Sequence, residues 1–525
     1  MPSLPETTAP PTKNFLRSYP YWLPPVVLSI ALNLYFLNPF IGDWDGLEYT
    51  VYSLRGAPSP MALGRSLFTL FNHALYVIAH AVFSAPPEKA YLIFKYAVVV
   101  ESGLAIIVCW VFARDLTGSR KPATIAALLV ACSPMFVIYS GQVMTDVPSV
   151  LLATTALLVH LRGIQQRRVW LVLLGAGLLG LGINLRETVG FYLPWLVIAP
   201  FVSGWKLDRR ALAVVGFSLV IFSGCAFGIF ALWFTDPAYR ATWHVWLSSM
   251  RNESARHPIG IANLRSFLVY FFLASPLVFV ALPFAAWKEW RERGWSLLLT
   301  AAGVGLFATA MLFFNYSTTI NWRYFLTGLP ALAPLAADYF VRSQAEKLKS
   351  RRRGFVTVIA GVLLVAGLME LLIKPAGDEY MNRLALAKDY NARLKLIPRD
   401  AVIIAGAETI AVTYWRGIGA GSWDWIGVGA GWPDGKLESK IKEHLQSSRR
   451  VFLDDDPRWW QPCSWHLREV NELARIEPHF HFIRIAPTIY EIRPAEDRSA
   501  NDQPHLEKLL AENRPEEVKN CFNAE

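Results

Sequence analysis

The sequence predicts a polytopic α-helical membrane protein that ends in a small C-terminal α/β domain. Of its 525 residues, 54% are hydrophobic and 13% are aromatic, and the mean hydropathy is positive. Apolar runs recur along residues 21–373, and a membrane-spanning helix needs about 20 such residues. The charge also divides: residues 1–371 contain 30 Lys and Arg against 17 Asp and Glu, whereas residues 372–525 contain 21 against 24.

The first 20 residues are polar and predict a cytoplasmic N-terminus. Lys13 and Arg17 precede the first apolar run, and no small-residue cleavage site follows it, so this run is expected to remain as an anchor. About eleven transmembrane helices are predicted. They cover residues 21–41, 90–113, 122–142, 147–161, 169–185, 188–205, 211–234, 265–287, 295–315, 324–341 and 354–373.

Basic residues concentrate in every second connection, which the positive-inside rule assigns to the cytoplasm. These residues are Arg114, Arg120, Lys121, Arg162, Arg167, Arg168, Lys206, Arg209, Arg210, Lys288, Arg291, Arg293 and the run from Arg342 to Arg353. The other connections are predicted to be extracytoplasmic: 42–89, 144–148, 186–187, 235–264 and 316–323. The chain is therefore expected in a cell inner (cytoplasmic) membrane, multi-pass, with residues 374–525 on the periplasmic side.

The first outer loop, residues 42–89, contains an apolar stretch that polar residues interrupt. Within 61–84, Leu67, Leu70, Phe71, Ala74 and Ile78 recur at helical spacing, which is typical of amphipathic helices on a membrane surface. A short twelfth span is the alternative, although it would break the alternation of charge between the connections.

Residues 374–494 show strands that alternate with helices, which predicts an α/β domain. Strands are expected at 401–405 and 450–454, with a terminal hairpin of 482–485 and 488–492. Helices are expected at 407–416, 435–447 and 465–476. Residues 495–525 are charged and poor in hydrophobic residues, so a loosely held tail is predicted.

Two further features of this part concern covalent and aromatic contacts. Cys463 and Cys521 can pair if the domain lies outside the cytoplasm. The segment Ser422-Trp423-Asp424-Trp425-Ile426-Gly427 is interpreted as an exposed aromatic loop over an active site.

Charged residues of the outer connections are predicted to form one site on the extracytoplasmic side. Arginines on this side contradict the general charge bias, and an anionic phosphate that Arg binds bidentately would explain them. Snorkelling, or pairing with nearby acids as between Arg186 and Glu187, is the alternative for a single arginine. The group comprises Asp43, Asp45, Glu48, Arg65, His73, Asp146, Arg186, Glu187, Arg240, His244, Arg251, Arg256, His257 and Arg323.

The acids allow more than one role. Asp43 and Asp45 stand two residues apart, which suits a general base with a supporting carboxylate or a pair that binds a divalent cation. Asp146 lies between two spans in Met-Thr-Asp-Val-Pro, where Asp146 or Thr145 could serve as a helix N-cap instead.

Four short motifs occur in an order that resembles a known family. They are D-W-D-G-L-E-Y in the first outer loop, T-D-V-P, L-R-E-T, and N-W-R-Y-F-L-T-G-L-P before the tenth span. This set resembles the GT-C membrane glycosyltransferases over about residues 20–345. The likeness is to the branch of protein O-mannosyltransferases, lipid A aminoarabinose transferases and lipopolysaccharide-core galacturonosyltransferases (families 39 and 83).

The resemblance implies a GT-C-like fold and an inverting transfer of a hexose or pentose. The donor would be a polyprenyl-phosphate sugar, and the acceptor would be a hydroxyl of a lipid, glycan or protein. It assigns Asp43 or Asp45 as the general base and Asp146 as a second acid. Arg186 and Arg323 are the residues that it assigns to the donor phosphate, and we expect Arg251 and Arg256 to support them.

Departures from the family leave the acceptor open. The chain has Asp-Trp-Asp where an Asp-Glu pair is common, and it lacks an inserted β-trefoil region. The Trp423 segment faintly resembles the W-W-D-Y-G motif of oligosaccharyltransferases, which is one alternative. A transporter or flippase of a lipid-linked saccharide is another, as is a membrane-anchored binding protein that works through its C-terminal domain. The charge pattern predicts a bilayer partner and no nucleic acid.

Overall fold

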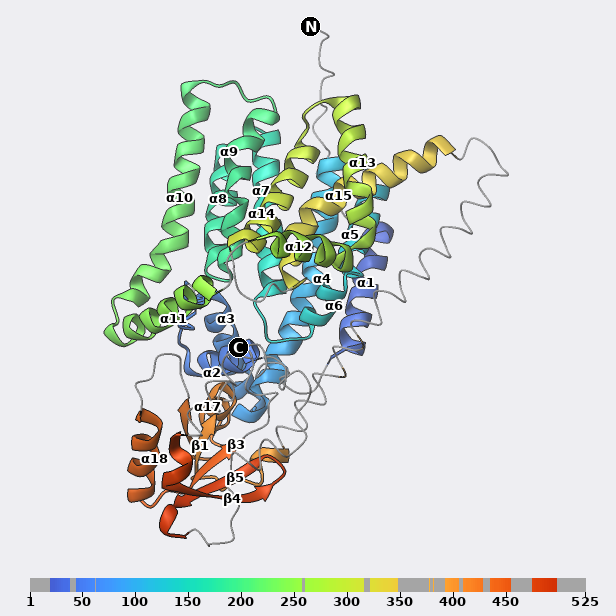
Figure 1. Ribbon diagram of the computed structural model, residues 1–525. Coiled ribbons are helices and arrows are strands. Elements are labelled where there is room, and N and C mark those ends of the chain that lie inside the picture. The colour runs from blue at the N-terminus through green and yellow to red at the C-terminus, as the bar shows by residue number, and fades with distance from the viewer. Residues whose placement is uncertain are drawn as a thin grey trace. The chain divides into compact units, whose positions relative to one another are not determined.

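The computed structural model describes residues 19–37, 44–61, 63–256, 260–315, 322–347, 377, 381, 392–405, 409–427, 435–454 and 475–497 (Figure 1). The predicted span 354–373, the helix at 465–474, the tail beyond 497, Asp43, His257, Cys463 and Cys521 lie outside these residues. The chain divides into two compact units. The helical unit is Met1–Pro39, Tyr52–Ala85 and Lys89–Arg383, and the C-terminal unit is Phe40–Val51, Pro86–Glu88 and Leu384–Glu525.

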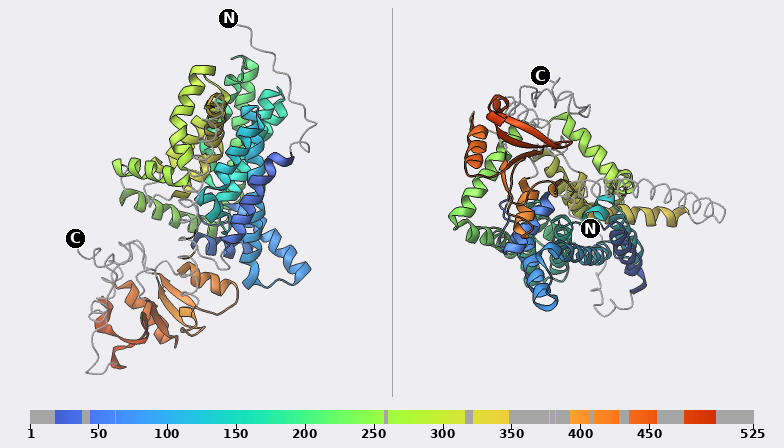
Figure 2. Two further views of the ribbon diagram at one scale, coloured as in Figure 1. Left: turned by 90° about the vertical axis from the view of Figure 1, so that its right-hand side faces the viewer. Right: turned by 90° about the horizontal axis from the view of Figure 1, so that it is seen from below.

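The helical unit consists of helices that run alongside one another (Figures 1 and 2). Its elements are α1 (Tyr19–Tyr35), α3 (Ser66–Phe83), α4 (Ala90–Thr117), α5 (Arg120–Ala131), α6 (Pro134–Ser140), α7 (Asp146–Gln165), α8 (Val169–Ile183), η3 (Glu187–Tyr192), α9 (Leu193–Val202), α10 (Arg209–Phe234), α11 (Pro237–Arg256), α12 (Ile261–Ala274), α13 (Pro276–Arg293), α14 (Leu297–Asn315), η4 (Trp322–Tyr324) and α15 (Phe325–Lys347). Helix α2 (Trp44–Arg55) begins in the C-terminal unit and ends in this one, and η2 (Pro87–Lys89) precedes α4.

Among the described residues, four helices are long and apolar enough to cross a membrane. They are α3, α4 with η2, α7 and α10, and counting each of two bent pairs as one span raises the number to six. Shorter apolar helices cover Tyr21–Tyr35, Val169–Ile183, Glu187–Val202 and Leu297–Leu312. The chain is thus a helical protein with several apolar helices, and the number eleven stays a prediction.

Two segments that were predicted as single spans are broken helices. The span at 122–142 consists of α5 and α6, which meet at 64°, and the span at 265–287 consists of α12 and α13, which meet at 106°. In both cases a proline, Pro134 or Pro276, is the first residue of the second helix. Proline has no N–H to donate and restricts the residue before it to extended backbone, so the helix cannot continue.

The two breaks contact each other. Ser133, the N-cap residue of α6, donates its hydroxyl to the backbone carbonyl of Ala274, the last residue of α12, at 2.9 Å. Ser133 and Ala274 are both buried. A carbonyl in the last turn of a helix has no partner within its helix, and this hydroxyl supplies one where water is excluded.

Glycines bring α7, α8 and α10 into close contact. A Cβ on Gly175 of α8 would lie 2.7 Å from the backbone nitrogen of His160, and one on Gly180 would lie 2.3 Å from the carbonyl oxygen of Phe222 in α10. Helices in lipid bury no apolar surface from water when they associate. Their association therefore depends on close packing at small residues such as these. These two contacts fix α8 against α7 and α10.

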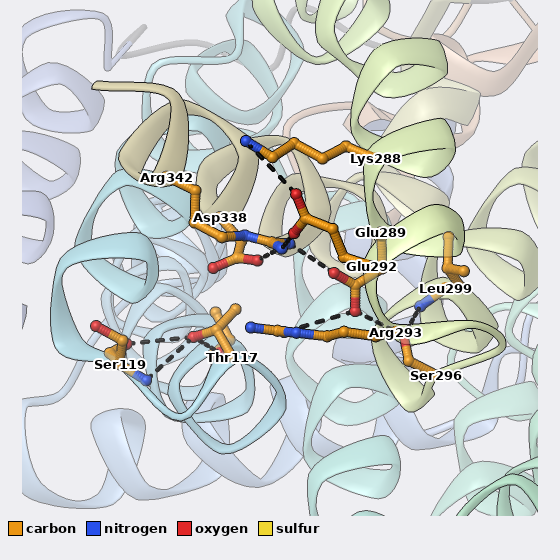
Figure 3. Close-up of polar contacts among 11 residues, drawn as sticks. Thr117, Ser119, Lys288, Glu289, Glu292, Arg293, Ser296, Leu299, Asp338 and Arg342 are labelled. Atoms are coloured by element: carbon orange, nitrogen blue, oxygen red, sulfur yellow. Dashed lines mark hydrogen bonds and ion pairs between the residues drawn. The ribbon is translucent and has the colours of Figure 1, made fainter. Parts of the chain in front are cut away.

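A charged cluster joins α13, α14 and α15 (Figure 3). Arg342 binds Glu289 at 2.5 Å, Glu292 at 2.6 Å and also Asp338. Glu289 is fully buried and also accepts a hydrogen bond from the Ser296 hydroxyl at 2.9 Å. Buried carboxylates need such partners, since removing one partner leaves an uncompensated charge.

The C-terminal unit contains a five-stranded sheet of order β2-β1-β3-β5-β4. Strand β1 (Val402–Ala405) pairs in parallel with β2 (Asp424–Gly427) and β3 (Val451–Asp454). Strand β5 (Ile489–Pro494) is antiparallel to both β3 and β4 (Phe480–Ala486). Helices α17 (Thr409–Gly417) and α18 (Lys436–Gln446) and the short η6 (Glu477–His479) and η7 (Ala495–Asp497) complete the described elements.

This sheet confirms four predicted strands and corrects one segment. The segment that includes Trp423 was expected to be an exposed loop, but Asp424–Gly427 form the edge strand β2 and Trp423 is buried. The pairing of Asp424 to Gly427 with Val402 to Ala405 accounts for the difference, because a strand partner stabilises a segment that lacks clear alternation in its sequence.

We predict that Arg342→Met destabilises the protein by about 1–3 kcal/mol, since the fully buried Glu289 loses its closest cation and keeps only Arg293 at 3.5 Å among the described residues. The measurement is thermal unfolding of the purified protein in detergent. Arg291→Met is the matched control, because Arg291 lies exposed on the same helix α13. Equal melting temperatures for the two variants would contradict the role given to the cluster.

Candidate active site

Two acids and two arginines alternate at one end of the helical unit. Asp146 is the first residue of α7, and Arg186 precedes η3. The Nη1 atom of Arg186 lies 2.5 Å from Oδ1 of Asp146. Beside them, Nη2 of Arg65 lies 3.2 Å from Oε1 of Glu187. The order of charges is therefore acid, base, acid, base, with no net charge.

The Asp146–Arg186 pair is almost completely buried. Asp146 is 3% exposed and Arg186 is 4% exposed. Among the described residues, Asp146 is the ion-pair partner of Arg186. Oδ2 of Asp146 and Oγ1 of Thr145 are buried and have no hydrogen-bond partner in this part of the chain. A buried acceptor without a partner is costly, so these oxygens suit a bound hydroxyl.

The turn before α7 has Thr145 as its N-cap residue, as the helix-cap alternative expected, but without a side-chain capping hydrogen bond. The carboxylate of Asp146 is directed to Arg186 instead. A negative charge in the first turn of α7 is still favoured by the helix dipole.

Arg186 and its neighbour Glu187 form their ion pairs with other residues. Arg186 contacts Asp146, and Glu187 contacts Arg65 at the start of α3. Burial by itself raises the pKa of Glu187, but the positive charges of Arg65 and Arg186, with hydrogen bonds from the backbone and from Arg65, outweigh it and hold this pKa below its ordinary value. Glu187 is therefore ionised at neutral pH.

Arg65 reaches Glu187 from an unusual backbone position. It is the N-cap of α3 and has a positive φ of 44°, in the left-handed region. This conformation is uncommon for a residue with a Cβ. The next turn is also held, because the N–H of Leu67 donates to the carbonyl of Asn184 at 3.2 Å. The start of α3 is thus attached to the segment between α8 and η3.

Arg323 approaches the same region from η4. Its guanidinium carbon lies 5.8 Å from the ring centre of Tyr139 in α6, a cation–π contact. The neighbouring Tyr324 is buried, and the charges of Arg323, Arg186, Asp146 and Glu187 all act on its phenol.

The other predicted site residues lie on α2, α3 and α11 or are outside the described residues. Asp45 and Glu48 lie half-buried in α2, in the part that belongs to the C-terminal unit. Nδ1 of His73 donates to the carbonyl of Ser53 at 2.8 Å, so His73 ties α3 to the end of α2. Exposed positions on α11 are occupied by His244 and Arg251, while the side chain of Arg256 lies outside the described residues.

Sequence reasoning did not identify the hydroxyl groups around these charges. Thr188 and Tyr192 of η3 lie against Thr327 in the first turn of α15. Tyr192 and Tyr139 stand in largely apolar stretches, where a hydroxyl looks like an ordinary core residue. For Thr188, Tyr324 and Thr327, the signal was their position inside a motif.

Metal ligands were considered at Asp43 and Asp45. Among the residues that the structure describes, no group of three or more His, Cys, Asp and Glu could hold a metal ion. Because Asp43 is not among them, a divalent cation at this pair stays a prediction.

Comparisons with known proteins assign the class of the fold. The chain has the fold of the GT-C membrane glycosyltransferases. A model of the dolichyl-phosphate-mannose-protein mannosyltransferase family matches residues 73–227, which include α4, α7, Asp146 and Arg186. A comparison with curated protein sequences gives no significant match.

Solved structures agree with this class. ArnT from Cupriavidus metallidurans in the apo state is 14% identical, covers 91% of this chain and 98% of its own, and gives a TM-score of 0.54. The apo oligosaccharyltransferase of Archaeoglobus fulgidus is 13% identical over 94% of this chain and 76% of its own, with a TM-score of 0.53. The same enzyme tethered to an acceptor peptide is 12% identical over 93% and 75%, with a TM-score of 0.54.

We predict that Glu187→Gln lowers the free energy of unfolding by about 1–3 kcal/mol at neutral pH, because Arg65 loses its charged partner. The folded pKa of Glu187 is depressed. The wild-type advantage is therefore complete above the ordinary glutamate pKa of about 4.3 and is lost as the pH falls through the folded value. Chemical denaturation at several pH values measures it.

The control for this experiment is Glu443→Gln, whose carboxylate is exposed and pairs with Lys440 on α18. Exposed pairs of this kind contribute little, so this variant should follow the wild type. A loss in Glu187→Gln that stays constant down to the acid limit would show that the charge of Glu187 is not what stabilises the fold.

Proposed function

We propose that the protein is an inverting glycosyltransferase that moves a sugar from a polyprenyl-phosphate donor to an acceptor hydroxyl on the extracytoplasmic face of the membrane. The observation that carries the proposal is the buried Asp146–Arg186 pair, with Arg323 over the ring of Tyr139 and close enough for its charge to act on Tyr324 as that of Arg186 does. The GT-C fold and the family match over residues 73–227 support the reaction class.

The chemistry of the donor explains a need for two cations. A sugar joined to a polyprenyl phosphate is a phosphodiester with one negative charge, and the leaving polyprenyl phosphate gains a second charge. Arg186 has N–H groups beyond the one that binds Asp146, and Arg323 supplies the second guanidinium. Preorganised cations in a site without water stabilise such a developing charge by several kcal/mol, about 3–4 for one donor.

The transfer is a single displacement. The acceptor oxygen attacks the anomeric carbon, its proton passes to a carboxylate, and the bond from the anomeric carbon to the phosphate oxygen breaks with its electron pair on the phosphate. One displacement inverts the anomeric centre, through a transition state with oxocarbenium character. Asp43 or Asp45 is proposed as the base. Asp146 orients Arg186 with one oxygen and offers the buried Oδ2 to a substrate hydroxyl.

The location belongs to the proposal too. The cytoplasm supplies nucleotide sugars, whereas the outer face of an inner membrane does not, so a lipid-linked donor fits a site on that face. The expected arrangement is a cytoplasmic N-terminus and a periplasmic C-terminal domain. A divalent cation at Asp43 and Asp45 is left open, and no step of the displacement depends on it.

The test uses purified full-length protein in detergent. Lipids extracted from cells that lack the protein supply the donor, envelope material from the same cells supplies the acceptor, and mass spectrometry follows the release of free polyprenyl phosphate. A transferase releases it, whereas a flippase or a binding protein leaves the donor intact. No release by the wild-type protein would overturn the proposal.

We predict that Asp146→Asn reduces this release by at least about 100-fold, because an amide cannot hold Arg186 as an ion pair and presents a donor beside it. Asp43→Asn should abolish the release with folding unchanged. The control is Asp236→Asn on the exposed turn before α11, which should retain activity. Near-normal release by both Asp43→Asn and Asp45→Asn would exclude a base at this pair.

A further inference from the structure

The short helix η3 carries contacts to three other segments. The residue before it, Arg186, binds Asp146 of α7, and its first residue, Glu187, binds Arg65 at the start of α3. The hydroxyl of Thr188, the second residue of η3, lies 3.4 Å from the hydroxyl of Thr327 in α15. Its last residue, Tyr192, donates its phenol to the backbone carbonyl of Thr327.

These hydroxyl contacts join the segments that carry the two arginines of the site. Thr188 follows Arg186 by two residues, and Thr327 follows Arg323 by four. Each contact thus lies within about one helical turn of an arginine along the chain. Thr188 and Tyr192 are 2% and 1% exposed, so water does not compete for these hydrogen bonds.

The backbone on both sides of the contact is closely held. Arg186 donates its N–H to the carbonyl of Gly182 at 2.9 Å and accepts from the N–H of Val189 at 3.1 Å. On the other side, a Cβ on Gly328 would lie 2.1 Å from Oγ1 of Thr309 and 2.5 Å from the carbonyl oxygen of Gly305 in α14. Thr327, which directly precedes Gly328, therefore has little freedom to shift along α14.

We propose that Thr188, Tyr192 and Thr327 are positioning residues that set the gap between Arg186 and Arg323, so that both guanidinium groups bind the same phosphate. This inference rests on the proposed function. A phosphate that two arginines share requires a set distance between them, and the hydroxyl contacts are the direct link between their two segments. None of the three hydroxyl groups is assigned contact with the substrate.

The experiment measures binding of undecaprenyl phosphate to the full-length protein in detergent, with undecaprenol as the probe that lacks the phosphate. Tyr192→Phe and Thr188→Val should each weaken binding of undecaprenyl phosphate about 3- to 10-fold, the worth of one hydrogen bond. Binding of undecaprenol should not change. Thr188→Ser keeps the hydroxyl and should restore affinity, and Tyr339→Phe, a half-buried tyrosine further along α15, should bind like the wild type.

A double-mutant cycle separates positioning from a general loss of structure. In the Arg323→Gln background, Tyr192→Phe should have little further effect, because no guanidinium is left for it to place. Equal losses in both backgrounds, or a matching loss for undecaprenol, would overturn the inference. Normal binding by Arg186→Gln and Arg323→Gln would instead overturn the phosphate site of the proposed function. If these two lose affinity while Tyr192→Phe does not, the inference alone fails.

Discussion

The buried ion pair between Asp146 and Arg186 is the constraint on which the site depends. A single charge at this depth would cost several kcal/mol, so the start of α7 and the turn after α8 have to stay together. The remaining contacts follow from that: Glu187 is placed beside Arg186 by the chain itself, and Arg65 neutralises it. The start of α3 is thereby attached to the neighbouring helices through charge.

Helix α15 connects this site with the rest of the unit. Near its start Thr327 contacts η3, and close to its other end Asp338 and Arg342 take part in the cluster with Glu289. Between these ends, Gly328 lies against Gly305 of α14. A helix held at both ends and along one side is suited to present Arg323, which immediately precedes it, in one position.

Hydrophobicity and charge predicted much of this arrangement and missed identifiable parts. Apolar runs indicated α4 and α10 well, because their composition changes sharply at their ends. The hydrophobicity of a long segment changes little with a single proline, so the helix breaks at Pro134 and Pro276 were not predicted. Within the site, Asp146, Arg186, Glu187 and Arg65 stood out as charges near span ends. Which of them pair, and the role of buried hydroxyls such as that of Tyr192, depend on contacts between distant segments.

The hydrogen bond between Ser133 and Ala274 has a consequence for how the sequence can change. It closes two helix interruptions that are 141 residues apart in the chain, and neither interruption can relocate without stranding a polar group in an apolar interior. In related chains, the prolines after these two positions should therefore be inherited as a linked pair. A related chain in which one of the two interruptions became a continuous helix would need the same change at the other interruption. Otherwise it would need a new hydrogen-bond donor for the carbonyl of Ala274.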